Sequence, residues 1–448
     1  MKITFWGGAG TVTGSNYLVE TGKTKILVDC GLNQGSHFAE KENFKPFPYD
    51  PKEIQAVFVT HAHVDHTGRL PKLLKEGFRG TVYSTPPTKD FAELLLMDSE
   101  HLMQMEAQRE KEPPLYSTED VNELMKFWEG IPYHEKVEVG DISVELFDAG
   151  HILGSCTVLI SGDGKRVVFS GDLGNYPAPI IQPTEPLPDA DYCVLESTYG
   201  DRIHERTENR RDDLEDVVED TVKSGGVLLI PAFAMERTQE LLYHLHQLFE
   251  EKRIPKIPVF LDSPLAIKLT TVYKKYEKYF NPDSKHLAAS GDDILNFPEL
   301  QLTLTTEQSK AINQVPPPKI IIAGSGMSQG GRILHHERLY LSGAKNTILF
   351  VGYQSMGSLG RRVLEGEKRV HIFGEEVSVN AKVRSLPAYS AHADQSQLIA
   401  WIYPHRERLK KVFVVQGEGE ASQVLSQKLR DELAVDTLIP DKGQSVVL

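Results

Sequence analysis

Residues 60–66 read THAHVDH, which places three histidines and an aspartate within seven positions, directly after a short apolar run. At the end of an extended strand, side chains at positions i and i+2 point the same way, so His61 and His63 can bind one ion together. The chain then turns into a predicted helix, and this turn lets Asp65 and His66 face a second point nearby. Imidazole and carboxylate groups suit zinc, and manganese or iron less specifically. The stretch therefore predicts a metal site that needs further ligands from elsewhere in the chain.

The composition is that of an ordinary globular protein, with 448 residues, 40% hydrophobic and 25% charged. A prior of roughly 100–200 residues per domain predicts two or three domains. No apolar run approaches the ~18 residues that would span a membrane, and the first residues, MKITFWGGAG, indicate a strand and not a signal peptide. The net charge of -14 argues against a protein that coats nucleic acid by bulk attraction, although a local basic groove or bound cations could still recruit phosphate.

The three cysteines, Cys30, Cys156 and Cys193, are widely separated in the sequence and form no CxxC pair. A disulfide framework or a thiolate zinc finger is therefore not expected, and a reducing cytoplasm is the expected location.

The first 200 residues contain short apolar runs that end in Gly, Asp or His, which is how α/β folds present chemistry on loops at strand ends. Helical spacing is seen over 88–112 and 117–129, with Ser117 as N-cap and Asp120 three positions later. The predicted strands are 25–31, 56–61, 81–85, 143–151, 156–162 and 166–172.

After residue 202 the pattern changes to strong helices that alternate with buried-type strands, which predicts parallel βαβ units and a second domain. From about residue 370 the chain returns to short strands, a helix near 420–433 and a closing strand. The predicted elements of the second domain are helix 205–224, strand 227–231, helix 236–252, strand 258–262, helix 264–280, strand 319–323, a helix near 331–341 and strand 347–351. The order predicts a first domain that is interrupted by an inserted second one.

Other strand ends supply candidates for the missing ligands. His151 follows an apolar strand and precedes a glycine turn, Asp172 ends the run VVFSGD, and His392 precedes a predicted helix in AYSAHADQ. Each is a weak signal alone, since Asp172 in such a turn is often only a structural cap.

The motifs HxHxDH, GH, SGD and SAHAD occur in this order, and their combination resembles the metallo-β-lactamase superfamily. The insertion after LESTYGD resembles its β-CASP branch of RNA- and DNA-processing nucleases, and the resemblance covers essentially the whole chain. It implies the α/β class, with a metallo-β-lactamase αββα sandwich and an inserted α/β β-CASP domain. The expected boundaries are 1–203 and 369–448 for the two parts of the first domain and 204–368 for the insertion.

The resemblance also implies two zinc ions. His61, His63 and His151 would hold one, Asp65, His66 and His392 would hold the other, and Asp172 would bridge both. Asp29 would orient a ligand histidine from behind. Two ions roughly 3.5–4 Å apart activate a bridging water and stabilise both oxygens of a phosphoryl displacement. Asp65 is on this basis also expected to be catalytic.

Glu196, in LEST, matches the first acidic motif of the β-CASP family. Its implied role is to hold a general-acid histidine against the leaving oxygen, and the one histidine in the expected window is His371. The alternatives are a solvated carboxylate at a strand end for Glu196 and an ordinary strand residue for His371.

The stretch 324–339, GSGMSQGGRILHHERL, follows a buried strand and opens a helix. Its small residues would let backbone N–H groups approach a phosphate, with Arg332 as charge partner. A plain turn between a strand and a helix is the alternative. The candidate phosphate contacts are Ser325, Gly326, Gly330, Gly331 and Arg332.

Two further pairs of residues near this stretch have simpler expectations. Arg361 and Arg362 would add basic charge near the cleft, with solvation at the surface as an equal alternative. His335 and His336 are expected on the helix surface, since neighbouring positions face different sides of a helix.

The function favoured by these features is a two-zinc ribonuclease that cuts single-stranded RNA internally, from an end, or both, at a cleft between the two domains. One alternative is a small-molecule hydrolase of the superfamily acting on a thioester, lactone or β-lactam; the inserted domain and Glu196 argue against it. Another is a metal-free scaffold subunit, which the full ligand set argues against. The expected partner is single-stranded RNA, with no membrane; a homodimer stays an open alternative.

Overall fold

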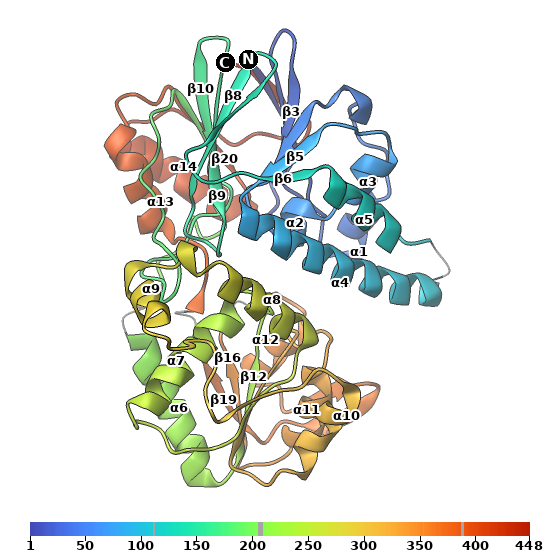
Figure 1. The fold of residues 1–448 in the computed structure, drawn as a ribbon, viewed down its shortest axis with the longest axis vertical. Helices are drawn as coiled ribbons and strands as arrows, with labels where there is room; N and C mark the ends of the chain where they lie inside the picture. The colour runs from blue at the N-terminus through green and yellow to red at the C-terminus, as the bar shows by residue number, and fades with distance from the viewer. Residues whose placement is uncertain (111–112, 205–208, 353, 387–388) are drawn as a thin grey trace. The chain divides into compact units, whose positions relative to one another are not determined.

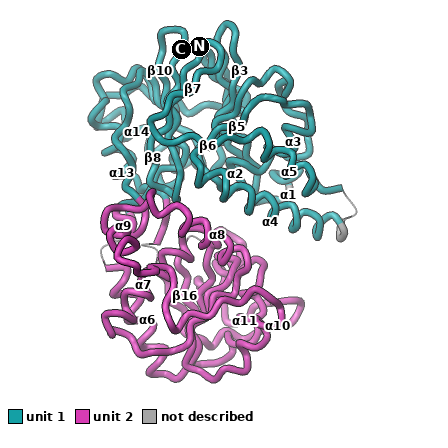
Figure 2. Tube along the Cα trace, viewed as in Figure 1, with its two compact units in different colours: residues 1–176, 182–203, 392–448 teal, residues 177–181, 204–391 magenta. Residues whose placement is uncertain are grey.

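The computed structural model describes residues 1–110, 113–204, 209–352, 354–386 and 389–448. These residues form two compact units, which Figure 2 distinguishes by colour. Unit 1 comprises residues 1–176, 182–203 and 392–448, and unit 2 comprises residues 177–181 and 204–391. The far end of the predicted helix 88–112 and the start of the predicted helix 205–224 lie outside the described residues.

Unit 1 is built around two seven-stranded sheets. The first sheet has the order β22-β1-β2-β3-β4-β5-β6 and the second has the order β21-β20-β11-β10-β9-β8-β7. The strands of the first sheet are β1 (Lys2–Gly7), β2 (Asn16–Glu20), β3 (Lys25–Val28), β4 (Ala56–Phe58), β5 (Thr81–Ser84), β6 (Trp128–Gly130) and β22 (Ser445–Val447). Those of the second are β7 (Lys136–Val139), β8 (Ile142–Asp148), β9 (Cys156–Gly162), β10 (Lys165–Phe169), β11 (Tyr192–Glu196), β20 (Lys411–Val415) and β21 (Thr437–Leu438).

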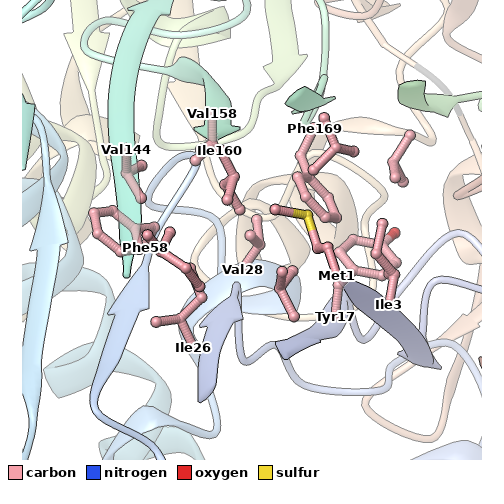
Figure 3. Packing of buried hydrophobic residues seen from close by; sticks show 14 of the residues in the cluster. Met1, Ile3, Tyr17, Ile26, Val28, Phe58, Val144, Val158, Ile160 and Phe169 are labelled. Carbon is pink, nitrogen blue, oxygen red and sulfur yellow. The ribbon is translucent and has the colours of Figure 1, made fainter. Parts of the chain in front are cut away.

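A hydrophobic core fills the space between the two sheets. Strand side chains alternate between the two faces of a sheet, so β8 buries every second residue. Ile142, Val144 and Leu146 of this strand belong to the core. Figure 3 shows Val28 and Phe58 from the first sheet packed with Val158 and Phe169 from the second. The core fixes the positions of the strand ends that carry the candidate ligands.

Helices cover the outer faces of both sheets (Figure 1), which confirms the predicted αββα sandwich. Leu398 and Leu425, from two helices of segment 392–448, pack against Val168 and Leu195 of the second sheet. The helices of unit 1 are α1 (His37–Glu42), α2 (Val64–Thr67), α3 (Leu70–Lys75), α4 (Pro86–Glu110), α5 (Thr118–Lys126), α13 (Gln395–Ile402) and α14 (Gly419–Leu433). Ser117 caps α5 in a reciprocal capping box with Asp120, as predicted.

Unit 2 contains one six-stranded parallel sheet, in the order β14-β13-β15-β12-β16-β19, and this confirms the predicted α/β insertion. Its strands are β12 (Val227–Pro231), β13 (Val259–Leu261), β14 (Leu300–Leu302), β15 (Lys319–Ala323), β16 (Thr347–Phe350) and β19 (Lys382–Ser385), beside the hairpin β17 (Arg369–Ile372) and β18 (Glu375–Ser378). Its helices are α6 (Arg210–Ser224), α7 (Arg237–Glu250), α8 (Pro264–Lys275), α9 (Pro282–Ala289), α10 (Thr306–Ala311), α11 (Ile333–Tyr340) and α12 (Leu359–Leu364).

The division into units differs from the expected boundary after residue 368. Residues 369–391 group with unit 2, because β19 pairs with β16 and so extends the parallel sheet. Residues 177–181 also belong to unit 2, where Ile181 forms a bridge with Phe280.

The topology of unit 1 brings several strand ends to one edge. β10 runs parallel to β11, and β11 runs parallel to β20, so the residues that follow these three strands emerge side by side. In the first sheet, β3 and β4 are also parallel. Among the residues that the structure describes, none of the helices is long and apolar enough to cross a bilayer.

Candidate metal centre

Three histidines and one aspartate, each placed after a strand of unit 1, converge on one point. His61 and His63 follow β4, His151 lies in the turn between β8 and β9, and Asp172 follows β10. The nearest ligand atoms of these four side chains all lie within 4.8 Å of one another. These are the four residues that the sequence assigns to the first metal, and the structure places them together.

The spacing of these ligand atoms fits a tetrahedral ion. Zinc–nitrogen bonds of about 2.0–2.1 Å separate the ligand atoms of a tetrahedral site by about 3.3 Å. His61 Nε2 lies 3.0 Å from His63 Nδ1, and His151 Nε2 lies 3.4 Å from the same atom. Asp172 Oδ2 is 3.4 Å from His61 Nε2 and 3.7 Å from His151 Nε2. The group therefore has the donors and the dimensions for zinc.

Asp172 also faces a second set of donors with its other oxygen. Oδ1 lies 3.4 Å from His66 Nε2 and accepts a hydrogen bond of 2.9 Å from Gln416 Nε2. Asp65 Oδ2 lies 3.8 Å from His66 Nε2. The carboxylate of Asp172 thus has one oxygen toward each of two neighbouring positions, as a bridging ligand would.

Asp29 holds two of these histidines from behind. Its Oδ2 accepts from His66 Nδ1 at 2.7 Å, which directs the lone pair of His66 Nε2 into the centre. Thr60 Oγ1 lies 2.9 Å from Asp29 Oδ2 and 3.1 Å from His61 Nδ1, so the same carboxylate supports His61 through a hydroxyl. Asp29 therefore contacts a candidate ligand histidine, and its expected orienting role stays a prediction.

His392 occupies a different environment from the one expected for a ligand grouped with Asp65 and His66. Its Nδ1 lies 3.5 Å from Glu196 Oε2 and 3.8 Å from Asp172 Oδ2, and these three side chains form a separate group with ligand-type spacing. A bridge between Gly174 and His392 positions it there. His392 is thus at the centre, but beside Glu196.

Glu196 is fully buried and holds the segment that carries Asp172. Its Oε1 accepts from the backbone N–H of Leu173 at 2.6 Å. The other oxygen, Oε2, faces His392, so the histidine that this carboxylate contacts in unit 1 is His392. His371, the histidine expected in that role, is an exposed residue of β17 in unit 2, paired across the hairpin with Glu376. The pairing of Glu196 with His371 stays a prediction.

The electrostatics of the centre favour bound cations. Burial lowers the pKa of His61 well below its ordinary value, which keeps that imidazole neutral and able to act as a ligand. Burial also disfavours protonation of His66, but Asp172, Asp29 and Asp65 outweigh it and raise the pKa of His66 well above 6.5. In the structure, however, Gln416 Nε2 donates to His66 Nε2, so this nitrogen carries no proton, and the three carboxylates would attract a cation in its place.

The pKa of His392 is raised to about 9. Burial acts against this change, but the neighbouring carboxylates, Glu196 before Asp172 and Asp65, dominate. The raised pKa favours a protonated His392 in the protein without metal, whereas the lowered pKa of His61 favours a neutral ring.

The glycine-rich loop of unit 2 follows β15 and leads into α11, as predicted. Two of its glycines are explained by packing: a Cβ on Gly326 would lie 2.7 Å from the ring of Phe233, and a Cβ on Gly331 would lie 2.3 Å from the carbonyl oxygen of Gly324. Gly326 is also buried, whereas Ser325 and Gly330 are partly exposed and Gly331 is exposed. The predicted phosphate contact at this loop stays a prediction, with Gly331, Ser325 and Gly330 as its more accessible members.

Arg332 is already engaged within unit 2. Its Nη1 donates to Asp262 Oδ1 at 2.7 Å and to the carbonyl of Thr303 at 2.9 Å, and its Nη2 donates to the carbonyl of Leu304 at 2.9 Å. The expectation of two surface histidines is wrong for His336, which is buried and bonds Asp262 Oδ2 at 2.7 Å.

Arg361 and Arg362 pair with acidic neighbours on the same segment, at 2.7 Å from Glu365 and 2.6 Å from Glu367. The expectation of surface solvation therefore describes them as well as that of a contribution to a basic groove.

Gln416 is a residue of the centre that the sequence analysis did not single out. It directly follows β20 and its side chain contacts both His66 and Asp172. The run KVFVVQG ends on a polar residue before glycine, which is the same signal that marked the other strand ends. The signal is weaker here because an amide is a less usual metal ligand than imidazole or carboxylate.

Comparison with known proteins gives three adjoining family matches along the chain. Residues 9–221 match the metallo-beta-lactamase superfamily, residues 238–363 match the Beta-Casp domain, and residues 376–440 match the Zn-dependent metallo-hydrolase RNA specificity domain. The last match contains both His392 and Gln416.

Several curated proteins are similar over nearly the whole chain. Ribonuclease TTHA0252 of Thermus thermophilus is 39% identical, over 100% of this chain and 98% of the relative. The RNase J-like protein of Methanocaldococcus jannaschii is 30% identical over 98% of both chains, and the transcription termination factor FttA of Methanosarcina mazei is 32% identical over 98% of this chain and 70% of its own length.

Among solved structures, a protein of unknown function from Enterococcus faecalis V583 matches with a TM-score of 0.56 and 13% identity, covering 100% of this chain and 99% of that one. This likeness concerns the fold alone. The family matches and the curated relatives, in agreement with the αββα sandwich, support one conclusion. The chain is a metal-dependent hydrolase that belongs to the β-CASP ribonuclease family of the metallo-β-lactamase superfamily.

Proposed function

We propose that this chain hydrolyses phosphodiester bonds of single-stranded RNA with two metal ions bound side by side in unit 1. The first ion, zinc, would be held by His61, His63 and His151. The second would be held by Asp65 and His66, and Asp172 would bridge the two.

The observation that carries this proposal is the two-sided environment of Asp172. One of its oxygens faces His61 and His151, while the other faces His66. Paired divalent ions lower the pKa of a shared water and stabilise the charge that develops on both oxygens of an in-line displacement at phosphorus. That chemistry fits phosphodiester hydrolysis, in which charge develops on both the attacking and the leaving oxygen.

Within this scheme, we assign the proton that the leaving oxygen needs to His392. Glu196 lies beside Nδ1 of His392 and raises the pKa of the ring to about 9, so the imidazole carries its proton at neutral pH. Nε2, on the opposite side of the ring, would donate that proton. The role first expected of His371 passes to His392 on this ground, and the role of His392 as a ligand of the second metal becomes the alternative.

RNA is the proposed polymer for two reasons. The relatives from Thermus thermophilus and Methanocaldococcus jannaschii are named a ribonuclease and an RNase J-like protein. The family match over residues 376–440 is described as an RNA specificity domain, and it includes the segment that carries His392. The loop would contact an RNA phosphate through the backbone N–H groups of Gly330 and Gly331, because the N–H of Ser325 donates to the carbonyl of Gly330.

The compartment that we propose is the cytoplasm. Cys30, Cys156 and Cys193 are all buried free thiols, which a reducing environment preserves.

The proposal is tested with metal-replete protein and three substrates: internally and end-labelled single-stranded RNA, DNA of the same sequence, and a thioester reporter. We expect RNA cleavage that chelator abolishes and added metal restores, with Asp172→Asn inactive. Internal fragments at early times would indicate endonuclease action, and mononucleotides would indicate action from an end. Hydrolysis of the thioester with intact RNA would overturn the proposal in favour of a small-molecule hydrolase.

A further inference from the structure

The amide of Gln416 is held in place by its backbone and by burial. Its N–H donates to the carbonyl of Gly8 at 2.6 Å, and its φ of 49° places it in the left-handed region directly after β20. The residue is 2% exposed. Gly8 lies close to the stem of the side chain, since a Cβ at that position would lie 3.1 Å from Gln416 Cγ. The freedom that remains is rotation of the terminal amide.

The amide nitrogen lies between two donors of the second metal position. Gln416 Nε2 is 3.1 Å from His66 Nε2 and 2.9 Å from Asp172 Oδ1. Because Asp29 occupies the other nitrogen of His66, the amide takes up the lone pair that would otherwise point to an ion. The hydrogen bonds of Gln416 therefore compete directly with metal binding at this position.

Tyr17 lies on the opposite side of the same amide, with its hydroxyl 3.5 Å from Gln416 Oε1. Burial raises the pKa of Tyr17 well above 10, so the hydroxyl stays protonated. A hydroxyl can donate to an amide oxygen or accept from an amide nitrogen. Tyr17 can therefore support Gln416 in either of its two orientations.

We infer that Gln416 is a reversible ligand of the second metal position. With its nitrogen inward, the amide satisfies His66 and Asp172 in the absence of an ion; turned over, it presents Oε1 as a neutral ligand beside Asp65. The inference rests on the proposed two-metal function and refines it: the two ions are bound unequally, and the second position is the weaker and more exchangeable.

The donor atoms of the two positions indicate which one binds zinc more weakly. The first position offers three imidazoles and one carboxylate oxygen, which suits zinc. The second offers one imidazole, from His66, against two carboxylate oxygens and one amide oxygen, and oxygen donors suit manganese better than they suit zinc. Each hydrogen bond that an ion must displace weakens binding roughly fivefold, so the second zinc should bind at least about tenfold more weakly than the first.

Metal titrations of the chelated full-length chain test this inference without any activity assay. Zinc binding is followed by calorimetry, and the ions that survive desalting are counted by elemental analysis. We expect one retained zinc, a second step at least about tenfold weaker, and an electron spin resonance signal of bound Mn²⁺ when one equivalent of zinc is already present.

Three variants make the result specific to the amide. Gln416→His adds an imidazole and should leave two zinc ions after desalting. Gln416→Leu keeps the size but removes the donors, so it should lose the second step and keep the first. Gln395→Leu removes a buried amide of the same unit, one that bonds the carbonyl of Gly200, and should match the wild type. Circular dichroism checks that each variant is folded.

Two equally tight zinc steps in the wild type would overturn the inference, and so would a Gln416→His variant with an unchanged second step. If the Gln416 variants do not fold, the wild-type titration decides alone. RNA cleavage is measured in parallel on the same samples. If RNA is cleaved and the two zinc ions bind with equal affinity, only this inference fails. If the two affinities differ but RNA is not cleaved, only the proposed reaction fails.

Discussion

Asp29 Oδ2 and His66 Nδ1 lie 2.7 Å apart, and both side chains are fully buried. The contact fixes which ring nitrogen of His66 faces Asp172, and Thr60 extends the same support to His61. Asp29 thus touches no candidate metal position itself but orients residues that serve both.

Asp29→Ala should therefore lower metal affinity without removing any ligand. Partners of this kind typically contribute 10–100-fold to metal affinity. The measurement is a competition titration with a chelator of known affinity. Asp163→Ala is the matched control, since its carboxylate pairs with the amino group of Met1, away from the centre. Unchanged affinity in Asp29→Ala would show that the buried carboxylate serves only packing.

His392→Ala should slow RNA cleavage by roughly 10²–10⁴-fold, the usual contribution of a general acid, while the metal content stays at the wild-type level. His371→Ala should leave cleavage close to wild type. Both are measured as single-turnover rates beside elemental analysis. The opposite pattern, with His371→Ala slow and His392→Ala depleted in metal, would restore the roles that the sequence alone suggested.

The stability of the metal-free protein should fall as pH rises above neutrality. The pKa of His392 in the folded state is about 9, above its ordinary value of 6.5, so its contribution is fully present below pH 6.5 and is lost as pH rises through about 9. For His392 the loss amounts to at most about 3 kcal/mol in the free energy of unfolding.

Urea unfolding of chelated protein at several pH values measures this loss. Glu196→Gln removes the main carboxylate beside His392 and should flatten the dependence between pH 6.5 and 9. A stability that rises over this range would contradict the assignment of a protonated imidazole to the metal-free centre.

Asp262 should be a large contributor to the stability of unit 2. It is fully buried, it accepts hydrogen bonds from Thr303, Ser309, Arg332 and His336, and its pKa is lowered to about 2. Burial alone would raise that pKa, so the four donors outweigh it.

Asp262→Ala leaves the Arg332 guanidinium without its carboxylate and should cost about 3–5 kcal/mol in the unfolding of unit 2. Asp220→Ala removes the exposed partner of Arg384 and should cost under about 1 kcal/mol. An equal loss of unfolding free energy in both variants would show that the buried cluster around Asp262 stabilises unit 2 no more than an exposed ion pair does. Because Arg332 bonds Asp262, a substitution of Arg332 can weaken RNA binding by destabilising unit 2, so the stability of such a variant must be measured as well.

Much of the fold and of the first metal position could be predicted because the signals are local. Each ligand follows a short apolar run, and strand ends are readable from one stretch of sequence, as at His61, His151 and Asp172. The alternation of helices and strands after residue 202 likewise indicates the parallel sheet of unit 2 without any knowledge of its neighbours.

The partners of those residues were harder to predict because they depend on pairing between distant strands. Glu196 ends β11 and Gln416 follows β20, and these strands are neighbours only because they pair although residues 204–391 of unit 2 separate them in the sequence. That pairing brings Gln416 to the centre, and the bridge from Gly174 brings His392 to Glu196. The expected surface position of His336 is wrong for a related reason, because its buried partner Asp262 is far away in the sequence.

The order of these strands also sets when the centre can exist during synthesis. A chain made as far as residue 391 contains all of unit 2 but still lacks His392, β20 and Gln416. Domains form in the order in which they leave the ribosome. The hydrolytic centre is therefore assembled last, so a nascent chain carries an incomplete catalyst while its own messenger RNA is still being translated beside it.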